Sequence, residues 1–118
     1  MEVTMTNFYA AEKKLTFADF LISRGEGDTY ASAAYKHTLA AVTIIVQELT
    51  NLEEPAIRSP QLVAKAFKRF NEPKAAAYSK FYLDLMKLAG KPTIPANNVE
   101  EAIRKARDFM EWVKDHKV

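Results

Sequence analysis

The chain has 118 residues and a net charge of +2, and 48% of its residues are hydrophobic. This length and composition predict one globular domain over residues 1–118, and so small a net charge does not by itself indicate a nucleic-acid partner. The lack of cysteine excludes disulfides and cysteine metal sites, and no apolar run is long enough for a membrane span, so we expect a cytoplasmic protein without membrane contact.

The first predicted helix runs from about residue 6 to just before Gly25. Apolar side chains recur at three-and-four spacing and form its inner face: Phe8, Ala11, Leu15, Ala18 and Ile22. Phe17, Phe20 and Leu21 extend the apolar surface beyond one stripe. Because a single inner face does not need all of these side chains, we expect this helix to make a second packing contact.

The second predicted helix begins at Asp28 or Thr29, either of which can cap it, and ends at about Asn51. Its middle, residues 38–46, carries no charge. Small residues recur at helical spacing and would let another helix approach closely: Ala31, Ala34, Thr38 and Ala41. The β-branched residues alone would suggest a strand, but the apolar run continues into the helix-forming residues 47–49. We therefore predict a central helix that is buried on most sides and antiparallel to the first.

Ser59 and Pro60 predict the start of a third helix, with serine as its cap and proline at its first position. This helix ends at about Phe70, and its expected inner face is apolar: Leu62, Ala66, Phe67 and Phe70. Residues 71–73 break it and open a fourth helix, which runs to Ala89. The side chains expected to pack from the fourth helix are Tyr78, Phe81, Tyr82, Leu85 and Leu88 or Ala89.

The fifth predicted helix begins at Asn98, which together with Glu101 resembles a capping box, and it ends at about His116. Apolar residues at helical spacing form its inner face: Val99, Ala102, Ile103, Ala106, Phe109 or Met110, and Val113. The chain has few glycines and prolines and no repeat of fixed period. The sequence therefore predicts an all-α, five-helix bundle framed by the long first and second helices.

No catalytic motif is present in the sequence. The two histidines, His37 and His116, fall on different predicted helices without metal-binding neighbours, and there is no glycine-rich phosphate loop, serine-hydrolase motif or Glu-x-x-His pair. We expect His116 to be a solvent-exposed end residue. His37 is interpreted as a boundary residue bonded to a neighbour, with a hydrogen-bond donor in a pocket as the alternative. The sequence favours a binding domain over an enzyme and predicts no catalytic residue, metal or cofactor.

Positive charge is concentrated in the middle of the chain. Between Pro55 and Lys80 there are six basic residues and one acid, Glu72. The basic residues are Arg58, Lys65, Lys68, Arg69, Lys74 and Lys80. Such a segment suits RNA phosphates or an acidic protein partner, and Tyr78 is available nearby to stack on a base. The alternative interpretation is that these lysines only face water on short amphipathic helices.

Four stretches of the sequence carry a family resemblance. They are FYAAEKK at residues 8–14 with FLI at 20–22, GDTYASAAY at 27–35, the alanine pair at 40–41, and VEEAIRKARDF at 99–109. In this order they resemble the first, second and last helices of the HEPN superfamily, small helical proteins of bacteria and archaea, and the resemblance covers almost the whole chain. It implies a HEPN-like bundle that forms a homodimer.

Active members of that superfamily are metal-independent ribonucleases in which a histidine follows an arginine by four to six residues. Arg58 lies roughly where that arginine would be, but residues 59–70 contain no histidine, and the nearest such pair, Arg107 and His116, is nine residues apart. The resemblance therefore implies a degenerate, non-catalytic member that binds RNA or a protein partner of the minimal nucleotidyltransferase type, as in toxin–antitoxin systems.

The binding residues predicted from the charge pattern and the resemblance are Arg58, Lys65, Lys68, Arg69, Lys74, Tyr78 and His37. Two alternatives remain open. One is a metal-independent ribonuclease that uses Arg58 with Tyr78 or His37, and the other is a small-ligand site within the bundle.

Overall fold

The computed structural model describes residues 2–24, 28–91 and 94–117, with the side chains of residues 7–24, 30–91 and 94–116. The elements in chain order are α1 (Glu2–Ser23), α2 (Asp28–Thr50), the short 3-10 helix η1 (Ala56–Arg58), α3 (Pro60–Lys68), α4 (Pro73–Leu88) and α5 (Ala96–Lys117). Within these described ranges every regular element is a helix, which confirms the predicted all-α bundle. None of the described helices combines the length and the apolar character that crossing a bilayer requires.

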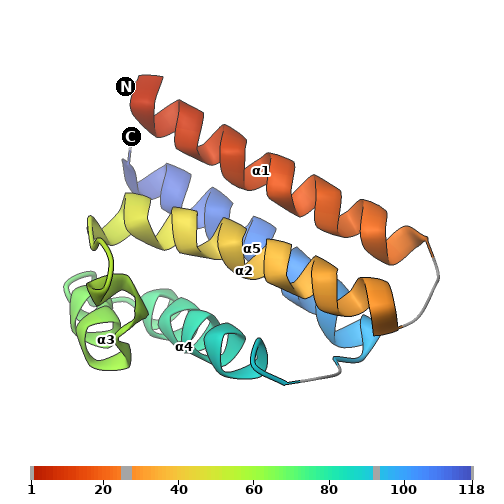
Figure 1. Ribbon diagram of the computed structural model, residues 1–118. Coiled ribbons are helices and arrows are strands. Elements are labelled where there is room, and N and C mark those ends of the chain that lie inside the picture. Colours follow the sequence, from red (N-terminus) through yellow and green to blue (C-terminus); the bar gives the residue numbers. More distant parts are fainter. Residues whose placement is uncertain (1, 25–27, 92–93, 118) are drawn as a thin grey trace.

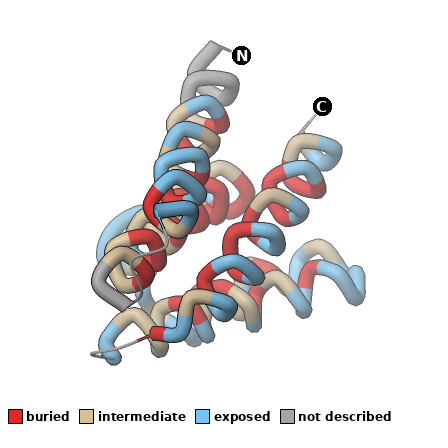
Figure 2. Tube along the Cα trace, turned by 90° about the vertical axis from the view of Figure 1, so that its right-hand side faces the viewer, coloured by how far each residue is buried: buried red, intermediate tan, exposed pale blue. Residues whose placement is uncertain are grey.

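The helices are arranged in three layers (Figure 1). α2 and α5 lie side by side in the middle and run in the same direction. α1 runs antiparallel to α2 and packs on both middle helices, while α3 and α4 cover the opposite side of α2. Buried residues face the space between the helices, and exposed ones face outward (Figure 2). The predicted frame of long antiparallel first and second helices is confirmed, and α5 joins it as a third long helix.

The burial of α2 follows from its small residues and its internal hydrogen bonds. The four small residues predicted to let another helix approach are all fully buried: Ala31, Ala34, Thr38 and Ala41. Thr38 and Thr50 donate their hydroxyl protons to the carbonyl oxygens of Ala34 and Val46, at 2.9 and 2.8 Å, so these buried hydroxyls keep a partner. Packing on most sides thus stabilises a helix whose β-branched residues have only modest helix propensity.

Short polar residues fix the ends of α2 and α3. Ser59 caps α3 by accepting a hydrogen bond from the backbone N–H of Leu62 at 3.3 Å, and Pro60 is the first helical residue, as predicted. Asn51 after α2 and Asn71 after α3 have φ values of 62° and 49°. Asparagine tolerates this left-handed conformation, which is common just after a helix ends. Both helices end within two residues of the predicted positions.

The inner face predicted for α3 was wrong at one position. Leu62 is 46% exposed, and Val63 is buried in its place, while Phe67 is buried as predicted. Val63 and Phe67 are one helical turn apart and pack together, whereas Leu62 lies about 100° around the helix from Val63. On α1, Leu21 is buried and Ile22 is half-buried, which shifts the inner face slightly at its end.

Two predicted helix starts also differ from the structure. α5 begins at Ala96, so Asn98 lies inside its first turn, where its backbone N–H donates to the carbonyl of Pro95, and it is not the cap. α1 begins at Glu2 and not near residue 6. The inner face of α5 is confirmed throughout. The turn at residues 25–27 and the capping side chains proposed at 28 and 29 lie outside what the structure describes.

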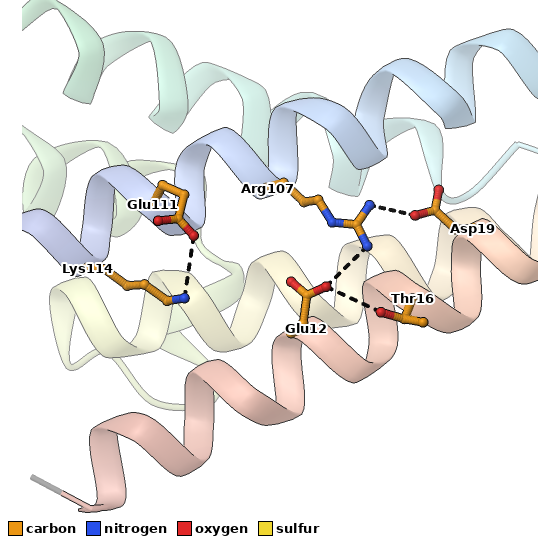
Figure 3. A network of polar contacts seen from close by, with 6 residues as sticks. All are labelled: Glu12, Thr16, Asp19, Arg107, Glu111 and Lys114. Carbon is orange, nitrogen blue, oxygen red and sulfur yellow. Dashed lines mark hydrogen bonds and ion pairs between the residues drawn. The ribbon is translucent and has the colours of Figure 1, made fainter.

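A charged contact joins α1 to α5 (Figure 3). The guanidinium of Arg107 on α5 donates to Asp19 at 2.5 Å and to Glu12 at 3.2 Å, both on α1. These side chains are between 35 and 52% exposed, so water screens the pairs and they contribute only about 1 kcal/mol or less. Their main effect is on the distribution of charge over α1, because both carboxylates are held on the flank of α1 that faces α5.

Candidate functional sites

Four basic side chains gather on the outer side of α3, at its end and in the first turn of α4. This α3 basic surface consists of Lys65, Lys68, Arg69 and Lys74, all of them exposed. The first three follow three-and-four spacing and lie opposite the buried Val63 and Phe67. No described acid forms an ion pair with any of the three lysines, while Arg69 Nε donates to the carbonyl oxygen of Ala66 at 3.4 Å. Three of the seven predicted binding residues thus share one side of α3 and its end, and Lys74 follows in the first turn of α4.

Arg58, another predicted binding residue, is paired with an acid. It ends η1, and its Nε donates to both carboxylate oxygens of Glu54, at 3.0 and 2.9 Å. Behind it, the fully buried Tyr82 donates its hydroxyl proton to the carbonyl oxygen of Ile57 at 2.9 Å and so fixes η1 to α4. Arg58 is therefore well positioned, but Glu54 balances much of its charge.

Tyr78 is half-buried between α4 and α5. Its ring centroid lies 4.8 Å from that of Phe109 and 5.5 Å from that of Trp112. Burial, and to a smaller degree the carboxylate of Asp108, raises the pKa of Tyr78 above its ordinary value. Phe70 likewise packs against Trp112, at 6.0 Å. Tyr78, which was predicted to lie beside the basic residues, and Phe70 therefore serve mainly as contacts within the bundle.

His37 lies toward α1. Its ring makes an edge contact with Phe17, with the centroids 4.8 Å apart. Arg58 and Tyr78, its partners in the ribonuclease alternative, belong to η1 and α4 on the other side of α2 (Figure 1). Among the described side chains there is also no cluster of His, Asp and Glu that could hold a metal ion. The geometry does not gather these predicted residues into one catalytic group.

The outer side of α1 exposes three large rings, here called the α1 aromatic surface: Tyr9, Phe17 and Phe20, which are 64, 44 and 52% exposed. Phe17 and Phe20 thereby confirm the predicted apolar surface beyond the core. Cations lie beside the rings, with Lys13 Nζ 5.3 Å from the centroid of Tyr9 and the Arg24 guanidinium 5.7 Å from that of Phe20. Glu12 and Asp19, the acids that bind Arg107, lie on the flank of α1 that faces α5. The outer stripe of α1 therefore combines aromatic rings with cations.

His116 joins the end of α5 to the start of α4. Its Nε2 lies 2.8 Å from the carboxylate of Glu72, and its Nδ1 lies 2.8 Å from the carbonyl oxygen of Trp112. Both partners are acceptors, so the imidazolium, which donates from both nitrogens, satisfies them best. The hydrogen bond to Glu72, followed by that to Trp112, raises the pKa of His116 above its ordinary value and outweighs desolvation. The residue is exposed, as expected, but the contact with Glu72 was not predicted.

A groove of about 480 Å³ lies between α4 and α5, here called the α4–α5 groove, and sequence reasoning missed it. Tyr35 of α2 lines it and is only 1% exposed. The buried hydroxyl of Tyr35 has no hydrogen-bond partner among the described residues. Burial, with the Asp84 carboxylate as a smaller cause, raises the pKa of Tyr35 to about 12, so the hydroxyl keeps its proton. No local pattern marks such a residue, because its partners depend on which helices pack around it.

The two buried tyrosines should respond in opposite directions to loss of the hydroxyl. Tyr82→Phe leaves the Ile57 carbonyl without its donor and should lower the free energy of unfolding by about 1–3 kcal/mol. Tyr35→Phe removes a hydroxyl that has no partner and should raise the free energy of unfolding by about 1 kcal/mol. Urea unfolding followed by circular dichroism measures both. A loss in Tyr35→Phe as large as in Tyr82→Phe would mean that the Tyr35 hydroxyl is bonded.

The contact between His116 and Glu72 should make stability fall as pH rises. Because the folded-state pKa of His116 lies above the ordinary 6.5, its contribution is fully present below about 6.5 and is lost as the pH rises through the higher folded-state value. Glu72→Gln removes the carboxylate that favours the proton. Thermal unfolding from about pH 5.5 to 8.5 should therefore show the melting temperature of the unmodified protein dropping relative to this variant. Parallel pH profiles would contradict the assignment.

Neither a family model, nor a curated protein, nor a solved structure matches the chain. Family membership therefore stays a prediction from the sequence. Three features carry the functional argument instead: the α3 basic surface, the α1 aromatic surface and the α4–α5 groove.

Proposed function

We propose that the chain is a non-catalytic, HEPN-like helical domain that binds RNA phosphates at the α3 basic surface. The observation that carries this proposal is the trio Lys65, Lys68 and Lys74, exposed and without an ion-pair partner among the described residues. Such cations bind phosphate without first separating from a carboxylate, and the counterions that RNA releases favour the complex. The HEPN-like character is supported by the sequence resemblance alone.

Basic residues on α5 are in a different situation. Arg104 and Lys105 lie 3.7 and 3.9 Å from Glu101, and Lys114 lies 3.4 Å from Glu111, so this helix balances much of its own charge. Beside the α3 basic surface the neighbouring acid in sequence is Glu72, which bonds His116. We therefore infer that the α3 basic surface keeps a positive potential that the exposed side of α5 lacks.

The expected contacts are to the RNA backbone. Tyr78 and Phe70 pack toward α5, so the described part of the α3 basic surface offers little ring area on which a base could stack. Binding should consequently depend on salt and tolerate different sequences. A protein partner of the minimal nucleotidyltransferase type, as in a toxin–antitoxin pair, would have to bring an acidic surface to the same cations, and it is the alternative outcome of the binding experiment.

We also propose that two copies of the chain pair through the α1 aromatic surface. Three rings and two cations follow one another along the outer stripe in the order Tyr9, Lys13, Phe17, Phe20 and Arg24, with the two phenylalanines side by side in the middle. When two such stripes run antiparallel about the midpoint of residues 16 and 17, Lys13 meets Phe20 of the other copy and Tyr9 meets Arg24. The stripe is then complementary to itself under a two-fold rotation, which a homodimer requires. The exposed ring area supplies a substantial part of the roughly 800 Å² that each partner of a stable dimer buries.

Changing Lys65, Lys68 and Lys74 together to alanine should weaken RNA binding and flatten its salt dependence. Fluorescence anisotropy with a labelled single-stranded RNA of about 20 nucleotides and mixed sequence measures both, and loss of three phosphate contacts should reduce the slope of log K against log salt by about 2. A triple variant with Lys36, Lys87 and Lys91 changed to alanine is the control, because it removes the same charge from other exposed positions.

Equal effects of the two triple variants, or RNA binding that ignores salt, would contradict the RNA proposal. Binding of polyglutamate with no binding of RNA would favour the acidic protein partner. RNA that is cleaved by the unmodified protein but not by Arg58→Ala would overturn the non-catalytic assignment in favour of the ribonuclease alternative.

The double variant Phe17→Ser, Phe20→Ser should be monomeric under conditions in which the unmodified protein sediments as a dimer. Sedimentation velocity measures this, and circular dichroism checks that the fold is kept, since both rings lie outside the core. Leu62→Ser is the control, because it removes an exposed apolar side chain from α3. A strictly monomeric unmodified protein, or a dimer that survives the double change, would rule out pairing through α1.

A further inference from the structure

The α4–α5 groove has the size and lining of a small-molecule site. Its volume of about 480 Å³ falls within the usual range of such pockets. Phe81, Leu85 and Leu88 line it from α4 and Ala102 lines it from α5, so a large share of its surface is apolar. Tyr35, from the central helix α2, is the most deeply buried of these lining residues.

The hydroxyl of Tyr35 is a buried polar group at this site that has no partner among the described residues. It is shielded from solvent, and no donor or acceptor among the described residues reaches it. Tyr82, on the neighbouring helix, shows the ordinary arrangement, because its hydroxyl donates to a carbonyl oxygen at 2.9 Å. A buried hydroxyl without a partner is unfavourable, and a ligand that accepts its proton in a hydrogen bond removes that penalty on binding.

The charged residues of the groove cancel one another. On α4, Lys80 Nζ lies 3.1 Å from Asp84, and on α5, Lys105 Nζ lies 3.9 Å from Glu101. Each wall thus carries one cation and one anion of its own, four residues apart. A ligand with a net charge would meet one like and one opposite charge on each wall, so the walls offer no net attraction that would offset the desolvation of an anion or a cation.

We infer that the α4–α5 groove binds a small uncharged molecule with an apolar ring body and a carbonyl oxygen that accepts a hydrogen bond from the Tyr35 hydroxyl. The ring packs on Phe81, Leu85 and Leu88. Because the Tyr35 hydroxyl is shielded from solvent, the side chains that cover it shift when the carbonyl oxygen reaches it. Because the phenol stays protonated at neutral pH, it acts as the donor. This site shares no residue with the α3 basic surface or the α1 aromatic surface. The ligand proposal can therefore be tested independently of the RNA and dimer proposals.

The test uses 2-acetylnaphthalene as the neutral ketone and measures amide shifts of the ¹⁵N-labelled protein. Three probes with the same ring system are compared: 2-naphthoate, 2-naphthylmethylammonium and 2-ethylnaphthalene. We expect saturable shifts around Ala77, Leu85 and Ala102 with the ketone, and weaker binding of the anion, the cation and the hydrocarbon. Tyr35→Phe keeps the ring and removes the donor, so it should weaken ketone binding by about fivefold to tenfold and leave the affinity for 2-ethylnaphthalene unchanged.

A second pair of variants tests the location of the site without touching the core. Ala77→Phe places a ring in the groove from an exposed position of α4 and should abolish binding of the ketone, whereas Ala76→Phe, at the adjacent exposed position outside the groove, should not. Absence of saturable shifts, tighter binding of a charged probe, or equal ketone affinity in Tyr35→Phe would each overturn the inference.

Discussion

The close packing of all other described elements around α2 is the constraint on which the rest of the structure depends. α1, η1, α3, α4 and α5 each contact this helix. Small residues such as Ala34 and Ala41 are fully buried on this helix, and small side chains let neighbouring helices approach closely. Enclosure also means that polar groups on α2 must be satisfied locally, as Thr38 and Thr50 are, or left unsatisfied, as the Tyr35 hydroxyl is.

The same arrangement separates the two outer surfaces. Arg107 draws the acids of α1 toward α5 and leaves rings and cations on the outer stripe, while the α3 basic surface lies on the other side of α2 (Figure 1). Pairing of two chains through α1 would therefore leave both α3 basic surfaces uncovered. A dimer of this kind would present two positive surfaces to one extended RNA, which would strengthen binding without any new contact.

Local patterns in the sequence were sufficient for most of the fold. The Ser59–Pro60 start, the buried small residues of α2 and the inner face of α5 all follow from spacing and capping within one helix. The features that local patterns did not predict depend on contacts between helices. Leu62 turned out to be exposed, Tyr78 packs on α5, and His116 reaches Glu72 across 44 residues of chain. Lys65, Lys68 and Arg69 could be placed on one side from the sequence, because they share one face of a short helix.

Tyr35 and Tyr82 show why the α4–α5 groove could not be predicted from the sequence. Both rings pack in the core, as phenylalanine would. The hydroxyl distinguishes them from phenylalanine, and only the fold decides what it meets: the carbonyl of Ile57 lies at 2.9 Å from Tyr82, while no described group reaches Tyr35. A hydroxyl that lowers stability and lines a groove has a physical role when a ligand accepts its hydrogen bond. That makes Tyr35, rather than His37, the side chain of the central helix with the clearest functional signature.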